Sequence, residues 1–170
     1  RELQNIYPEI RLSALRALPL NSMENVNKLL PLLSDETLAI RMETANKLSG
    51  LNQNQIPESY KEAFRLTIQE YIKALEYNAD FPLGKFSLGN IYYNLQQYDK
   101  AEKYYLEALD QDKELHLIKV NLAYLYNSIG KPIKAEKMFI DYLSHNPGDG
   151  NILFSYGLLL SELGKYRESL

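Results

Sequence analysis

The sequence contains no cysteine among its 170 residues, so a disulfide, a thiolate metal site and a thiol nucleophile are all excluded. Histidine is almost as scarce. The two that occur, His116 and His145, have no neighbour at the spacing of metal ligands, and we interpret both as solvated surface residues. No serine has a histidine partner for a catalytic triad, and no glycine-rich phosphate loop is present. We therefore expect no enzyme activity, no metal and no cofactor within these residues.

Long stretches of one chemical character are also missing. No apolar run approaches the roughly 18 residues of a membrane-spanning helix, so no membrane span is expected. The net charge is −3 without a long run of either sign, which makes nucleic acid or an anionic membrane surface an unsuitable main partner. The chain opens on Arg1 without an initiator methionine or a signal peptide, and we expect it to be a fragment or a processed product. The compartment is not indicated.

The sequence has instead an internal repeat with a period of about 34 residues. The stretch LGNIYYNLQQYDKAEKYYLEAL at 88–109 recurs in its pattern of small and bulky residues at 122–143 and, cut short, at 156–170. Within each stretch, apolar residues follow the i, i+3, i+4, i+7 spacing of a helix. Gly89 and Gly157 occupy one place in the repeat, in mid-helix, where glycine costs about 1 kcal/mol relative to alanine. We therefore predict that paired helices approach closely at this position.

These residues resemble the tetratricopeptide repeat (TPR) family, on the stretches LGNIYYNLQQYDKAEKYYLEAL, NLAYLYNSIGKPIKAEKMFIDYLSHNP and SYGLLLSELGKYRES. The resemblance covers 81–170, where the last unit is truncated, and extends in part over 63–80. It implies an all-α fold, an α-solenoid in which antiparallel helix pairs form a right-handed superhelix. The small residues Gly89, Ala101 and Ala135 are then expected to be buried between helices.

The TPR resemblance also implies a concave groove, lined by the first helix of each unit, that binds a peptide or a partner segment. The expected lining residues are Phe86, Asn90, Tyr93, Asn94, Val120, Asn121, Tyr124, Asn127, Phe154, Leu158 and Ser161. Some TPR proteins hold a terminal carboxylate with a lysine, two asparagines and further basic residues. Asn90 and Asn121 match the asparagines, but Phe86 replaces the lysine, and Asn151 and Ser155 replace the basic pair, which disfavours such a clamp. The expected groove is neutral and suited to main-chain hydrogen bonds and apolar anchors. The alternative, that the asparagines only face solvent, stays open.

The first fifty residues follow a different and shorter period. EIRLSALRAL at 9–18 matches AIRMETANKL at 39–48, and the stretch LLPLLSDETLAIRMETANKL resembles the HEAT repeat family. This second resemblance covers about 5–50. The HEAT family commonly places an aspartate in the turn and an arginine in the next helix, which bond across neighbouring units.

Asp35 and Arg41 match the HEAT aspartate and arginine, and we expect them to interact with each other or with Arg11. In the earlier half-unit, Asn5 stands where the aspartate before Arg11 would be. Any exposed pair of this kind contributes about 0–1 kcal/mol and sets register more than stability.

The expected organisation has three parts: HEAT-like helical repeats over 1–55, one long bridging helix with partial TPR character over 56–80, and TPR units over 81–170. The bridging helix resembles the second helix of a TPR unit, but no first TPR helix precedes it. Helix 36–49 is expected to take the place of that missing helix, so that the HEAT-like and TPR parts form one continuous solenoid. Breaks between helices are predicted near 19–21, 34–35, 50–55, 78–81, 96–97, 112–115, 130 and 146–149.

We expect a non-catalytic scaffold for protein–protein interaction, part of a larger protein, with a protein or peptide as partner. One alternative is a regulatory or C-terminal region of a larger enzyme or multihaem oxidoreductase, because HEAT-like repeats joined to TPRs are similar to the C-terminal part of some bacterial multihaem cytochromes. No CxxCH motif occurs here, so no haem is expected, and a periplasmic or extracytoplasmic location follows only from that similarity. A second alternative is a structural spacer without a ligand.

The last expected helix, 149–163, is apolar on most of its circumference. Such a helix needs cover on more than one side, and the truncated unit supplies no second helix for it. We therefore expect the natural protein to continue past Leu170, and this fragment either to self-associate through its C-terminal end or to have that end as its most mobile region.

Overall fold

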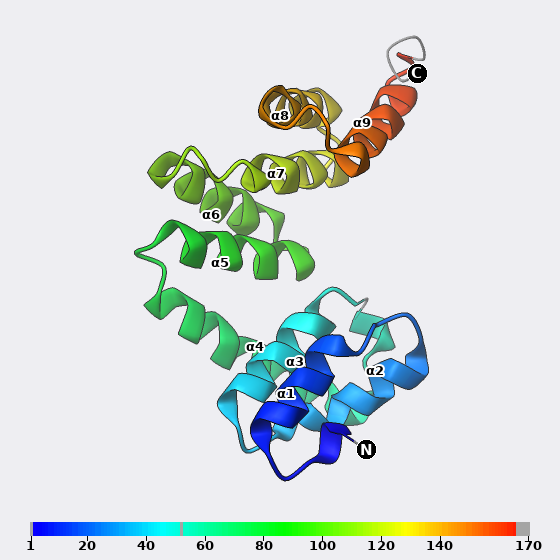
Figure 1. Ribbon diagram of the computed structural model, residues 1–170, viewed down its shortest axis with the longest axis vertical. Coiled ribbons are helices and arrows are strands. Elements are labelled where there is room, and N and C mark those ends of the chain that lie inside the picture. Colours follow the sequence, from blue (N-terminus) through cyan, green and yellow to red (C-terminus); the bar gives the residue numbers. More distant parts are fainter. Residues whose placement is uncertain (1, 52, 166–170) are drawn as a thin grey trace. The chain divides into compact units, whose positions relative to one another are not determined.

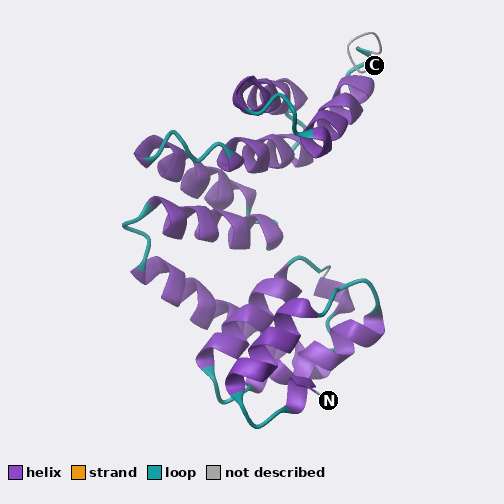
Figure 2. Ribbon diagram, in the orientation of Figure 1, coloured by secondary structure: helices purple, strands orange, loops and turns teal. Residues whose placement is uncertain are grey.

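The computed structural model describes residues 2–51 and 53–165, and these residues form helices without any strand (Figures 1 and 2). The α-helices are α1 (Pro8–Ala17), α2 (Met23–Leu29), α3 (Leu38–Ser49), α4 (Glu58–Tyr77), α5 (Pro82–Asn94), α6 (Tyr98–Gln111), α7 (Leu117–Ser128), α8 (Pro132–His145) and α9 (Gly150–Glu162). Short 3₁₀ helices occupy Glu2–Gln4, Leu30–Ser34 and Gln53–Gln55. The prediction of an all-α repeat fold is confirmed, and every predicted break falls between two α-helices. No helix in the described ranges is long and apolar enough to cross a membrane.

The chain divides into two compact units, Arg1–Tyr77 and Asn78–Leu170, which are described separately. In the first unit, α3 packs against both α1 and α4, and α4 also contacts the 3₁₀ helix Leu30–Ser34. Pro31 stands in the first turn of that 3₁₀ helix and lacks the N–H that would continue α2, so α2 ends at Leu29. The core of the unit is built from buried aliphatic side chains, among them Leu15, Leu29, Leu33, Ile40 and Leu48.

The repeat of the first unit reappears in its hydrogen bonds. Nη1 of Arg11 donates to the main-chain oxygen of Asn5 at 2.7 Å, and Nη1 of Arg41 donates to that of Asp35 at 2.8 Å. In both turns the side-chain oxygen Oδ1 accepts from the main-chain N–H two residues later, at 3.0 Å for Asn5 and 2.8 Å for Asp35. Each arginine therefore anchors the turn that precedes its own helix. Asn5 can occupy the position that Asp35 has in the next turn, because the arginine binds the main-chain carbonyl there and not the side chain.

Each of these arginines also binds a carboxylate through one edge of its guanidinium group, where Nε and Nη2 donate to the two carboxylate oxygens. Arg11 binds Asp35 with two contacts of 2.9 Å, as expected from the sequence. Arg41 binds Glu70 of α4 at 2.9 and 2.6 Å. The expectation of an Asp35–Arg41 contact is therefore met only through the Asp35 main chain. The side-chain partner of Arg41 is a residue that the sequence pattern did not indicate.

The second unit repeats one backbone motif at the same place in each successive repeat. Its helices pack in pairs, α5 with α6 and α7 with α8, and α9 follows on α8 (Figure 1). Gln96, Gly130 and Gly164 follow the first helices with φ of 58°, 69° and 73°, in the left-handed region. The next N–H in each turn bonds to the carbonyl five residues earlier, at 2.9, 2.8 and 2.9 Å. This is a Schellman motif, and it turns the chain into the second helix.

The close approach predicted at Gly89 is confirmed. A Cβ atom added at Gly89 would lie 2.4 Å from Cδ1 of Tyr105, whose side chain is itself buried. Ala101 and Ala135 are buried as well. Small residues in this repeat therefore make room for large aromatic side chains of the partner helix.

Candidate functional site

The first helices of successive pairs are joined by hydrogen bonds between side chains. On α5 and α7, Nδ2 of Asn121 donates to Oδ1 of Asn90 at 2.7 Å. One turn further along, the hydroxyl groups of Tyr93 and Ser128 are 3.2 Å apart. These two contacts form two rungs between α5 and α7, which also contact each other as helices.

The same two rungs recur between α7 and α9, with all four positions shifted by one repeat. The hydroxyl groups of Tyr124 and Ser155 are 2.9 Å apart, and Nδ2 of Asn127 is 3.5 Å from Oε2 of Glu162. The residue types change, yet the positions that meet are the same. We call the surface made by these side chains the ladder face; its members are Asn90, Tyr93, Asn121, Tyr124, Asn127, Ser128, Ser155 and Glu162.

The amides of the first rung are only partly used by the protein itself. Oδ1 of Asn90 also accepts a hydrogen bond from the Tyr105 hydroxyl at 2.8 Å. Burial raises the pKa of Tyr105, although the nearby Asn121 amide acts in the opposite direction, so this hydroxyl stays protonated and donates. Within the described residues, Nδ2 of Asn90 and Oδ1 of Asn121 have no hydrogen-bond partner. The rung therefore keeps one free donor and one free acceptor, both half-buried.

The other residues expected in the groove differ in how much of them is exposed. Phe86 is half-buried against the ring of Tyr105, with 6.0 Å between ring centroids, and Asn94 is also half-buried. Val120 is only 5% exposed, so we leave it out of the candidate surface. Ser161 is exposed on α9.

The exposed apolar side chains of this surface gather on α9. Phe154 is 69% exposed and Leu158 is 53% exposed, one helical turn apart. Leu158 stands one repeat after Tyr124 and two after Asn90, so it occupies the rung position that a tyrosine and an amide fill in the earlier units. We include Phe154 and Leu158 in the ladder face, which thus changes from amides on α5 and α7 to apolar side chains on α9.

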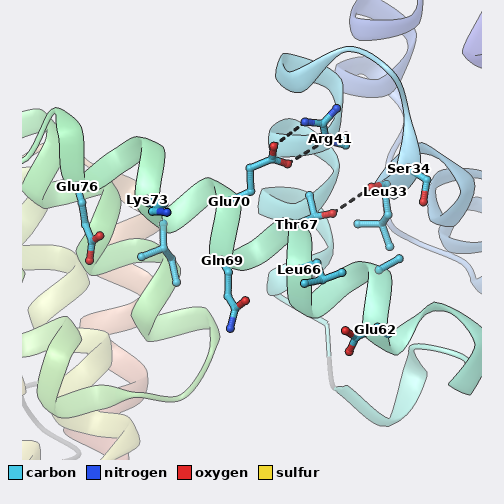
Figure 3. Close-up of a pocket in the computed structure, with 12 residues that line it drawn as sticks. Leu33, Ser34, Arg41, Glu62, Leu66, Thr67, Gln69, Glu70, Lys73 and Glu76 are labelled. Atoms are coloured by element: carbon cyan, nitrogen blue, oxygen red, sulfur yellow. Dashed lines mark hydrogen bonds and ion pairs between the residues drawn. The ribbon is translucent and has the colours of Figure 1, made fainter.

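A large open cavity lies elsewhere, in the first unit, and no sequence pattern indicated it. It has a volume of about 1090 Å³ and is lined by residues of α4 together with Leu33, Ser34 and Arg41. Figure 3 shows Arg41 facing Glu70 and Thr67 turned toward Leu33. The Thr67 hydroxyl donates to the Leu33 carbonyl at 3.0 Å, and Arg41 and Glu70 neutralise each other at 2.6 Å. These polar groups therefore serve the fold.

The prediction of solvated surface histidines agrees with His145, which is exposed, but not with His116, which is half-buried. Their rings stack with 4.3 Å between centroids, where the turn before α7 meets the end of α8. Nδ1 of His116 is buried, with no hydrogen-bond partner in the described ranges. Among the same residues, no cluster of three or more His, Cys, Asp or Glu side chains could hold a metal ion.

Comparison with known families finds one match in this unit. Residues 82–115 match the model of the tetratricopeptide repeat, over a stretch that comprises α5, α6 and the following turn. No curated protein matches the chain significantly. Tetratricopeptide repeats generally mediate protein–protein interaction and are typically non-catalytic, and the matched stretch supplies Asn90 and Tyr93 of the ladder face.

Proposed function

We propose that the chain is a non-catalytic interaction scaffold that binds an extended segment of a partner protein on the ladder face. The observation that carries this proposal is the recurrence of both rungs in the next repeat. It supports a surface that runs across α5, α7 and α9 with regularly spaced side chains. Regular spacing suits a partner that is itself regular, and an extended main chain is the simplest such partner.

The free atoms of the first rung support an extended partner. An extended peptide presents N–H and C=O groups along its length, and each must keep a hydrogen-bond partner when it leaves water. Asn90 offers a donor and Asn121 an acceptor, so the pair complements one C=O and one N–H of a bound main chain. Tyr124, Phe154 and Leu158 then supply apolar contact for side chains.

For the N-terminal part we propose HEAT-like repeats over 1–55, followed by a bridging helix with partial TPR character over 56–80. The recurrence of the arginine contacts, first at Arg11 and then at Arg41, supports this interpretation. The packing of α4 against α3 supports the idea that α3 stands in for a missing first helix. The two alternatives, a region of a larger enzyme or multihaem oxidoreductase and a spacer without ligand, stay predictions.

Peptide selection tests the proposal. Random peptides are selected by phage display against the full chain, and the affinities of enriched peptides are measured by isothermal titration calorimetry. Leu158→Ser should weaken binding about four- to fifteenfold, because full burial of a leucine contributes about 1.5–3 kcal/mol and about half of this side chain is exposed before binding. The side chain is 53% exposed, so the substitution should leave folding intact.

Leu106→Ser is the matched control, since Leu106 is 45% exposed but lies on α6, away from the ladder face. Binding should survive this change. If no peptide is enriched, or if enriched peptides tolerate Leu158→Ser and lose affinity with Leu106→Ser, the ladder face is not the binding surface.

A further inference from the structure

The helices that open the successive repeats of the second unit, α5, α7 and α9, carry very little charge. Along the whole of α5, α7 and α9, the only charged side chains are Lys85, Lys119 and Glu162. Surfaces of soluble proteins are usually rich in mixed charge. On a surface with so few charges, each remaining charged group has a large effect on which partners bind.

Both lysines are neutralised within the fold. Nζ of Lys85 lies 3.5 Å from Glu107 of α6, and Nζ of Lys119 lies 2.9 Å from Asp141 of α8. Their side chains are largely buried, and each points toward a second helix. Both members of the second pair stand one repeat after those of the first, so the pairs belong to the repeat itself.

Glu162 has no such compensation. It is exposed, and its only polar contact within the described residues is the amide of Asn127 at 3.5 Å. No lysine, arginine or histidine of the same residues forms an ion pair with it. Within the described part of the chain, Glu162 is therefore the one uncompensated charge on the first helices, and it is negative.

The position of Glu162 makes it part of the apolar surface. Phe154, Leu158 and Glu162 follow one another at intervals of four residues on α9, so they form a single strip along one side of the helix. Four residues rise about 6 Å along a helix. In an extended peptide, side chains on one side recur every two residues, which is about 6.6 Å. The two spacings agree closely enough for three successive contacts.

We propose that this strip selects partner segments in which two apolar side chains and one lysine or arginine alternate with other residues: apolar, any, apolar, any, basic. The proposal rests on the proposed function of the ladder face and concerns only the part of the bound segment that follows α9. The basic side chain pairs with Glu162, and the apolar ones cover Leu158 and Phe154. Acidic segments and free carboxyl termini are rejected, because α5, α7 and α9 as described offer no free cation to receive a carboxylate.

The test uses capped peptides of defined sequence, and calorimetric titration of the full chain at low salt. The probes are acetyl-Gly-Phe-Ser-Leu-Ser-Lys-Gly-amide, its reversed sequence, and the forms in which Gln or Glu replaces Lys. In the preferred direction, the Lys peptide should bind about two- to fivefold more tightly than the Gln peptide, as expected for an exposed ion pair. The Glu peptide should bind more weakly than both. The preference should disappear at about 1 M salt, where the screening length is about 3 Å.

Glu162→Gln should remove the preference for Lys while the Gln peptide keeps its affinity. Glu114→Gln is the matched control, because the Glu114 side chain is 88% exposed and lies before α7, away from the strip. A Lys preference that survives Glu162→Gln, or equal affinities for the three peptides, overturns the inference. If the three peptides bind equally but Leu158→Ser abolishes their binding, the proposed function stands and only the charge preference is wrong. Absence of binding by every probe counts against the strip as a docking site.

Discussion

Replacing Gln96 by glycine should stabilise the second unit, because Gln96 lies in the left-handed region with φ of 58°. Glycine holds the same place in the next two turns, as Gly130 and Gly164. A residue with a Cβ atom loses roughly 1–2 kcal/mol in this conformation. About 0.5–1 kcal/mol of this gain is lost, because glycine has more conformational entropy than glutamine in the unfolded chain. The free energy of unfolding should therefore rise by about 0.5–1 kcal/mol.

The rest of the turn should not change with this substitution. The hydrogen bond that closes the motif runs from the N–H of Gln97 to the carbonyl of Tyr92 at 2.9 Å, and both groups belong to the main chain. The Gln96 side chain is exposed, so its removal deletes no packing. Urea unfolding followed by far-UV circular dichroism measures the effect. The melting temperature should rise by about 1–4 °C.

Two further substitutions separate backbone conformation from side-chain effects. Gly130→Gln introduces the strain that Gln96→Gly removes, and no atom lies within 4 Å of a Cβ atom placed at Gly130. It should therefore lower the free energy of unfolding by a similar amount. Gly148 has equal space but lies outside the left-handed region, so Gly148→Gln should change stability less. If Gln96→Gly is neutral and Gly130→Gln costs nothing, the left-handed conformation of these turns does not determine their stability.

Three other changes are predicted. Gly89→Ala should cost about 1–3 kcal/mol in urea unfolding because the new methyl group overlaps Tyr105, and a loss below about 0.5 kcal/mol would contradict the packing. Burial acts to raise the pKa of Asp35, but hydrogen bonds, chiefly from Arg11, outweigh it and hold that pKa below its usual value. The stability from this carboxylate is present above about pH 4 and is lost as pH falls further. Asp35→Asn should therefore lower the free energy of unfolding at pH 7. It should also reduce the loss of that free energy as the pH is lowered below about 4. Burial and a hydrogen bond to a carboxylate raise the pKa of Tyr126 to about 12, so stability should fall between about pH 10 and 12, and less steeply in Tyr126→Phe.

The features that could be predicted from the sequence are those fixed by local periodicity. Helix breaks, and the burial of Gly89 and Ala101, follow from the spacing of small and bulky residues, which repeats where the structure repeats. The conformation at Gln96 was not predictable, because glutamine does not ordinarily indicate a positive φ. Only its alignment with Gly130 and Gly164 contained that information.

Contacts between distant helices were harder to predict. The spacing from Asp35 to Arg41 indicated correctly that these two residues meet, although the contact uses the main chain of Asp35. The partner of the guanidinium group, however, depends on where α4 passes, and Glu70 lies within a stretch whose pattern belongs to the other repeat. A sequence pattern places a residue on a helix face; the neighbouring helix decides which atoms it meets.

The asparagines of the ladder face illustrate the same limit and its consequence for binding. The pattern placed Asn90 and Asn121 on one surface but left open whether they bind a ligand or face solvent. In the structure they bind each other, which neither alternative anticipated. An amide has a donor end and an acceptor end, so a rung uses one end of each side chain and leaves the other free. Holding two helices together and offering hydrogen bonds to a partner are therefore compatible roles for the same pair.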